Sequence, residues 1–130
     1  MSLGTSATPL GKVRGLGSAE HGGEHWLEER FTSVALVLLS LWLLFSLMLL
    51  PDLAQRTLTE WLRDPFAAVP MALFVIAAFK HGLDGMKVVV DDYVHDHGNR
   101  LATHFLLTMA AVAGASLSLF ALAKIAFGAA

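Results

Sequence analysis

Residues 31–50 form an apolar segment that carries no formal charge and ends at Pro51. The hydrocarbon core of a bilayer is roughly 30 Å thick, and a helix of about 20 residues, rising 1.5 Å per residue, crosses it. The segment therefore predicts a transmembrane helix over 31–50, which limits the fold to membrane architectures. A hydrophobic content of 55% and a mean hydropathy of +0.61 agree, because both exceed what soluble domains show.

A second apolar run, 66–79, is too short to cross a bilayer, because as a helix it reaches only about 21 Å. To span, this helix must continue to about Val90, which places His81, Asp84 and Lys87 inside the membrane. Ionisable side chains at that depth are costly and mark functional sites by default. We therefore predict a second span over 66–90 that carries functional polar residues.

A third span is predicted over 101–127, interrupted by His104 near its start and Lys124 near its end. Between the spans, we expect a turn or two of interfacial helix in 52–64 and a polar loop over 91–100. Small residues in the third span permit close approach of a partner helix: Ala110, Ala111, Ala113, Gly114, Ala115, Ser116 and Ser118. Hydroxyl groups in the first span can bond to the backbone or to neighbouring helices: Thr32, Ser33, Ser40 and Ser46.

The predicted fold class is an all-α membrane protein with three transmembrane helices in 31–127, preceded by a polar N-terminal segment, 1–30, with an interfacial end. Three helices leave the polar groups of the second span short of partners, so we expect the chain to be part of a larger heteromeric helix bundle. The positive-inside rule favours a cytoplasmic N-terminus. The side that holds the N-terminus and the second loop has four cations, Lys12, Arg14, Arg30 and Arg100, and the opposite side has three, Arg56, Arg63 and Lys124.

Composition excludes several other classes. The chain has no cysteine, which excludes disulfides and cysteine-ligated metals or iron–sulfur clusters within it. A net charge of −2 gives no reason to expect nucleic-acid binding. The first 30 residues lack the apolar core of a secretory signal, and their four glutamates argue against a mitochondrial presequence.

On the second span, His81, Asp84, Gly85 and Asp92 share one helix face. Asp84 lies four residues after Lys80 and three before Lys87, so an ion pair is the simplest interpretation and an ion or proton relay the alternative. His81 suits either a hydrogen-bonded helix contact or axial ligation of haem iron, with Gly82 and Gly85 leaving room for the macrocycle.

Other polar residues are equally open on spacing alone. Asp92 and Tyr93 lie about 16–18 Å beyond His81 along a helix, at the membrane surface. There they form either an aromatic-belt tyrosine with a loop charge or a site that bonds a quinone carbonyl. His21 and His25 have a metal-like spacing, but we expect both on the solvated surface.

The pattern His81-x-x-x-Gly85-Met86-x-x-Val89-x-x-Asp92-Tyr93-Val94 resembles the signature of the small hydrophobic membrane anchors of succinate dehydrogenase, respiratory complex II. The segments 8–18 and 30–35 are similar to the alphaproteobacterial form of that family. The resemblance implies an anchor in the bacterial inner membrane that takes no part in succinate chemistry. It also implies three partner polypeptides: a second membrane anchor, an iron–sulfur protein that holds the clusters, and a flavoprotein that holds FAD.

The resemblance further assigns roles to individual residues. His81 matches the axial ligand of a haem b shared with the partner anchor, and Tyr93 with Asp92 matches the ubiquinone site. Arg30 and His25 fall in the region of the haem propionates, while Lys80, Asp84 and Lys87 match nothing in the pattern. Three alternatives stay open: a fumarate reductase anchor, a small ion- or proton-translocating subunit, and a purely structural anchor.

Overall fold

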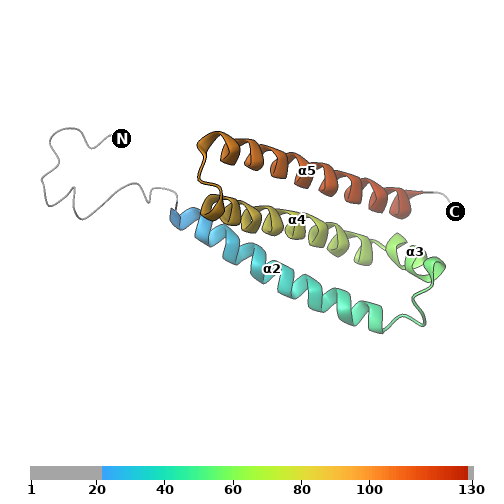
Figure 1. The fold of residues 1–130 in the computed structure, drawn as a ribbon. Coiled ribbons are helices and arrows are strands. Elements are labelled where there is room, and N and C mark those ends of the chain that lie inside the picture. Colours follow the sequence, from blue (N-terminus) through green and yellow to red (C-terminus); the bar gives the residue numbers. More distant parts are fainter. Residues whose placement is uncertain (1–21, 129–130) are drawn as a thin grey trace, which may run out of the picture.

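The computed structural model describes residues 22–128 of the 130-residue chain. Within that range it is all helical (Figure 1), and three of the helices are long and apolar enough to cross a membrane. The predicted architecture of an all-α protein with three spans is therefore confirmed. The elements are α2 (Gly22–Met48), α3 (Gln55–Arg63), α4 (Pro65–Tyr93) and α5 (His97–Phe127).

Helix α2 contains most of the predicted span 31–50 but is shifted toward the N-terminus, since it begins at Gly22 and ends at Met48. Its end falls short of Pro51 because a proline disfavours the α conformation in the residue before it. The nine-residue helix α3 confirms the short helical stretch expected in 52–64.

Helix α4 is continuous from Pro65 to Tyr93 and so contains the whole predicted span 66–90. Its start is fixed by Asp64, whose carboxylate accepts a hydrogen bond from the Phe66 N–H at 3.0 Å, while Pro65 occupies the first helical position, where no N–H is needed. The continuity matters for function, because His81, Asp92 and Tyr93 lie on one rigid element.

The predicted bounds of the polar loop, 91–100, are wrong, because the loop is much shorter. The chain leaves α4 at Val94 and enters α5 already at His97, so α5 begins earlier than the predicted 101. The Asp96 carboxylate caps α5 by accepting a hydrogen bond from the Asn99 N–H at 2.9 Å. Gly98 therefore sits in the first turn of a capped helix, where its low helix propensity costs little.

The three long helices form a single layer with α4 in the middle (Figure 1). Backbone contacts join α4 to α2 on one side and to α5 on the other, and within residues 22–128 none join α2 to α5. Figure 1 shows α2 diverging from α4 toward the end of the layer where α3 lies. There Trp61 of α3 stacks on Trp42 of α2, with ring centroids 5.8 Å apart and planes 22° apart.

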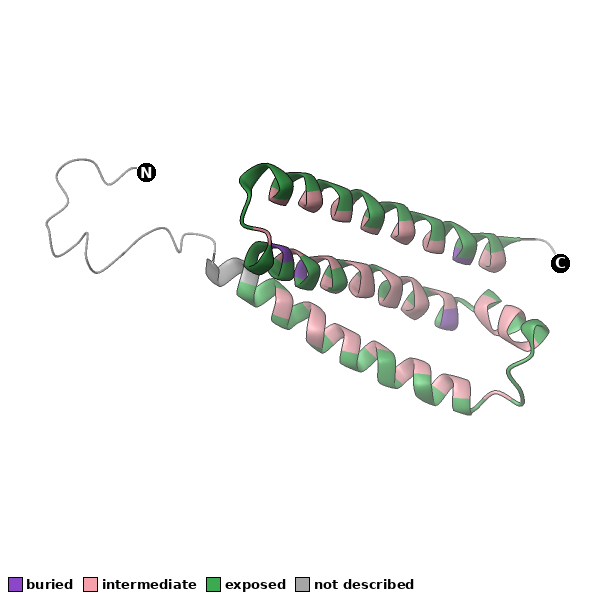
Figure 2. Ribbon diagram, viewed as in Figure 1, coloured by how far each residue is buried: buried purple, intermediate pink, exposed green. Residues whose placement is uncertain are grey.

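A layer one helix thick has almost no interior. Within residues 26–128, whose burial the structure describes, four are buried, namely Ala67, Asp84, Val90 and Leu122 (Figure 2). Large apolar side chains instead cover its outer surfaces, as expected of helices that meet lipid or other membrane proteins. Asp84 stands out, because it is the charged side chain among these four.

Candidate functional site

His81 lies on α4 and is half-buried against α2. Its Nδ1 is 3.2 Å from the hydroxyl oxygen of Thr32. That hydroxyl is also 3.1 Å from each of two carbonyl oxygens of its own helix, those of Glu28 and Glu29. His81 therefore has a defined hydrogen-bond partner on a neighbouring span, and one of its two ring nitrogens is already occupied.

A cluster of charges lies beside His81. The Lys80 ammonium contacts the Asp84 carboxylate at 2.5 Å and the Glu28 carboxylate of α2 at 3.2 Å. The predicted Lys80–Asp84 ion pair is confirmed, and Lys87, the other predicted partner, takes no part in it. The Asp84 side chain is 8% exposed, so its charge is compensated by Lys80 rather than by water.

There is open space next to His81 on α4. A Cβ atom added to Gly82 or Gly85 would meet no atom within 4 Å. A separate apolar groove of about 320 Å³ runs between α4 and α5; Phe79, Gly82 and Met86 line it from α4, and His81, which faces α2, does not. Gly85, four residues after His81 and on the same helix face, thus leaves room beside the imidazole for a large ligand.

The donor set fits haem better than a bare metal ion. Within the described residues, no three His, Cys, Asp or Glu side chains gather as a metal site. Haem iron is held in its porphyrin and needs only axial ligands from the protein, of which a half-buried imidazole is a common one. His81, with open space beside it, meets that requirement.

The described part of the chain offers no second histidine level with His81. Phe79 faces Gly114 across the α4–α5 contact, because a Cβ on Gly114 would lie 2.6 Å from the Phe79 ring. His104 lies ten residues from Gly114, about 15 Å along the axis of α5, and contacts Asp91 instead. A second axial ligand would therefore come from another polypeptide, as the sequence predicts.

Asp92 and Tyr93 end α4, and both are exposed, Tyr93 by 79%. Continuous helix separates them from His81 by about 16–18 Å. Next to them, Asp91 reaches across to α5, where its carboxylate lies 3.2 Å from His104 and 3.9 Å from Arg100. The sequence does not predict this cluster, because its breakers indicate a loop over 91–100.

Arg30 is not brought to His81 by any contact among the described residues. The Arg30 guanidinium lies 5.2 Å from the centroid of the Trp26 ring. Arg30 precedes Thr32 by two residues, so the two side chains point about 200° apart around the axis of α2. The role of Arg30 and His25 near the haem propionates stays a prediction. The side chains of His21 and His25 lie outside the described residues.

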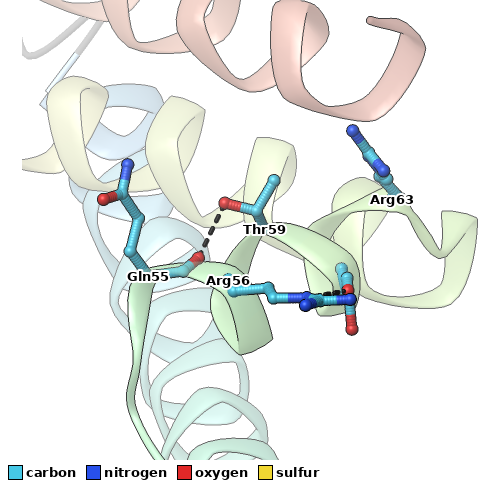
Figure 3. Close-up of a pocket in the computed structure, with 5 residues that line it drawn as sticks. Gln55, Arg56, Thr59 and Arg63 are labelled. Atoms are coloured by element: carbon cyan, nitrogen blue, oxygen red, sulfur yellow. Dashed lines mark hydrogen bonds and ion pairs between the residues drawn. The ribbon is translucent and has the colours of Figure 1, made fainter. Parts of the chain in front are cut away.

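A larger hollow of about 460 Å³ lies over α3 at the opposite end of the layer. Figure 3 shows its lining of Gln55, Arg56, Thr59, Glu60 and Arg63. Glu60 accepts a hydrogen bond from Arg56 at 2.9 Å, which raises the pKa of the guanidinium. These side chains are the polar face of an amphipathic surface helix, and we do not include them in the candidate site.

Comparison with known proteins gives a consistent answer. Residues 4–117 match a family model described as succinate dehydrogenase/fumarate reductase transmembrane subunit. The succinate dehydrogenase hydrophobic membrane anchor subunit of Paracoccus denitrificans is 31% identical over 122 residues, which is 94% of each chain. The protein of the same name from Rickettsia bellii is 36% identical over 83 residues, covering 64% of this chain and 66% of that one.

Proposed function

This chain belongs to the family of succinate dehydrogenase/fumarate reductase transmembrane subunits, and we propose that it co-ligates haem b and completes a ubiquinone site in a succinate:quinone oxidoreductase. It is a multi-pass membrane protein with three spans. The observation that carries the proposal is the placement of His81 and of Asp92-Tyr93 on one continuous helix, the first half-buried beside open space and the second exposed at its end.

His81 would be the axial ligand that this chain contributes to the iron. Haem, when bound, would supply one-electron redox chemistry. The chain's own part would be to present a neutral imidazole, to leave free space at Gly82 and Gly85, and to neutralise Asp84 with Lys80 so that no unpaired charge lies beside the ligand. The second ligand would come from the partner membrane anchor.

At the other end of the same helix, the Tyr93 hydroxyl would donate a hydrogen bond to a carbonyl oxygen of ubiquinone. Reduction of the quinone takes up two protons and two electrons, and the electrons would arrive from the flavoprotein through the iron–sulfur protein. Asp92, exposed next to Tyr93, would pass protons to that end of the helix. Hydrogen bonds to the carbonyl oxygens favour reduction because negative charge develops there.

The proposal includes a location in the bacterial inner membrane with the N-terminus in the cytoplasm. This places the end of the layer that carries Tyr93 on the side where the soluble partners would dock. The sequence supports it by a narrow margin, because four cations belong to the N-terminal segment and the second loop, Lys12, Arg14, Arg30 and Arg100, against three on the other side, Arg56, Arg63 and Lys124. A reporter fused to either terminus, read in intact cells, tests the orientation.

Haem ligation is tested by purifying the complex that carries His81→Ala and recording its reduced-minus-oxidised spectrum. We expect the b-type band to be lost. His104→Ala is the matched control, because His104 lies on α5 beside Asp91 and away from His81, and it should keep the band. A full band in the His81 variant would exclude His81 as a ligand.

The quinone role is tested by Tyr93→Phe, which removes only the hydroxyl. We expect ubiquinone reduction to fall by about 10²-fold, in the range seen when an electrostatic donor is removed from a reaction site. Succinate oxidation by an artificial dye acceptor should be unchanged, since that reaction belongs to the soluble partners. An equal loss of both activities would exclude a local role for Tyr93.

The family description also covers fumarate reductase, so the direction of the reaction is a second candidate that the assays must separate. Measuring succinate oxidation with ubiquinone and fumarate reduction with a quinol in the same preparation distinguishes them. The Lys80–Asp84 ion pair gives less support to ion or proton translocation, because each charge is satisfied by the other.

A further inference from the structure

We infer that Thr32 is a positioning residue for the haem. By accepting a hydrogen bond from Nδ1–H of His81, it holds the imidazole in the tautomer whose Nε2 carries the free lone pair for iron. The inference rests on the proposed haem ligation by His81 and adds a residue of α2 to that site. It also assigns the ligand atom, because Nδ1, 3.2 Å from the Thr32 hydroxyl, is already occupied.

The other hydrogen bonds of the Thr32 hydroxyl determine whether it donates to His81 or accepts from it. A hydroxyl has one hydrogen and two lone pairs. The carbonyl oxygens of Glu28 and Glu29, each 3.1 Å away, accept only, so the hydrogen is directed toward them, in the manner common for threonine in membrane helices. What the hydroxyl offers to His81 is then a lone pair, and Nδ1 must carry the proton.

The required chemistry points the same way. A neutral imidazole that binds a metal through one nitrogen carries its proton on the other, and the group that accepts this proton fixes both the tautomer and the ring orientation. If Thr32 instead donated to Nδ1, the proton would lie on Nε2 and no nitrogen would be free for iron. The observed contacts therefore select the form of His81 that can bind.

Thr32 is held in place by a second contact one turn away. Glu28, four residues earlier on α2, accepts a hydrogen bond from the Lys80 ammonium of α4 at 3.2 Å. Residues on two successive turns of α2 thus bond to two successive residues of α4. These two contacts fix the position of α2 along the axis of α4. The hydroxyl is part of a rigid contact rather than a side chain that reaches His81 by chance.

An acceptor on Nδ1–H raises the basicity of the imidazole and stabilises the ferric state. We expect Thr32→Val, which keeps the shape and removes the hydroxyl, to weaken haem retention about tenfold, the lower end of the effect of such groups. The midpoint potential of the haem should become more positive, by up to about 59 mV if the ferric state loses a factor of ten.

The experiment uses the purified complex with three variants of this chain and reads haem content and midpoint potential, neither of which depends on turnover. Thr32→Ser keeps the hydroxyl and should behave as the unsubstituted protein. Thr108→Val is the matched control, because the Thr108 hydroxyl makes the same kind of bond to its own helix, to the His104 carbonyl at 2.8 Å, away from His81. It should leave both readouts unchanged.

The outcomes separate this inference from the proposal beneath it. Unchanged haem content and potential in Thr32→Val would overturn the role of Thr32 while haem ligation by His81 stands. Equal haem loss in Thr32→Val and Thr32→Ser would also overturn it, because serine keeps the hydroxyl and the loss could then not be attributed to its removal. Retention of haem by His81→Ala would remove the proposed ligand and the inference with it.

Discussion

At the depth of His81, helix α4 contacts its two neighbours by different means. Toward α2 the contact is polar, with Thr32 bonded to His81 and Glu28 to Lys80. Toward α5, at the same depth, it is a close steric fit in which Gly114 receives the ring of Phe79. Lipid removes the hydrophobic drive for helices to associate, so packing and hydrogen bonds must join them. The polar contact fixes the orientation of a side chain, and the steric contact fixes a distance.

The largest effect is expected from filling the steric contact. A Cβ on Gly114 would already lie 2.6 Å from the Phe79 ring, so Gly114→Leu forces α4 and α5 apart. We expect a loss of about 2–3 kcal/mol in the free energy of unfolding, as for overpacked cores. The measurement is unfolding of the purified chain in mixed detergent micelles. Gly82→Leu, at a position with free space, is the control, and an equal loss there would refute the steric account.

A smaller effect is expected from the polar contact. Lys80→Met leaves the Asp84 carboxylate without its ammonium partner, and we expect a loss of about 1–2 kcal/mol, moderated because Lys80 is 44% exposed. The double variant Lys80→Met with Asp84→Leu removes both charges and should recover most of the stability. If the double variant is less stable than the single one, the ion pair is not what stabilises this contact.

The aromatic contact between α2 and α3 is weaker again. Trp42 and Trp61 stack at 5.8 Å, and such pairs contribute about 0.5–1.5 kcal/mol beyond the area they bury. A double-mutant cycle with Trp42→Leu and Trp61→Leu should give a coupling energy in that range. A coupling of zero would mean that α3 is held by its contacts with α4 and α5 alone.

The smallest effect concerns pH at the start of α3. The hydroxyl of Thr57 and the N–H of Ala54 donate to the Asp52 carboxylate and lower its pKa below 3.8. Since the folded pKa is the lower one, this stabilisation is fully present well above the ordinary pKa of a free aspartate and is lost as the pH falls through the folded value. Asp52→Asn should therefore lower the unfolding midpoint at neutral pH and have no effect in acid. A difference that persists in acid would contradict this cause.

The spans could be predicted because their signals are local. Length and apolar composition located all three helices, and the arithmetic from 66 to 90 placed His81 inside the second one. The prediction of a loop over 91–100 failed because Gly98 and Asn99 were interpreted as helix breakers. In the structure, Asp96 caps a helix that begins at His97, before both of them. A capping residue changes the meaning of the residues that follow it.

In the candidate site, sequence separation decides which contacts could be predicted and which could not. The Lys80–Asp84 pair spans one helical turn and was predictable from spacing alone. Thr32 and Glu28 are 49 and 52 residues away from their partners on α4, and which face of α2 meets that helix is decided by packing that no local pattern encodes. The sequence marked Thr32 only as one of several hydroxyls able to bond to a neighbour.

The single-layer arrangement of α2, α4 and α5 has a consequence for the life of the chain in the cell. Both faces of α4 stay uncovered, and four side chains within residues 26–128 are buried. Most of the contacts that stabilise the three long helices must therefore be made with other polypeptides or with lipid. Its abundance should then follow theirs, because a copy synthesised in excess leaves its large apolar side chains without protein partners and open to the proteases that clear unassembled membrane proteins.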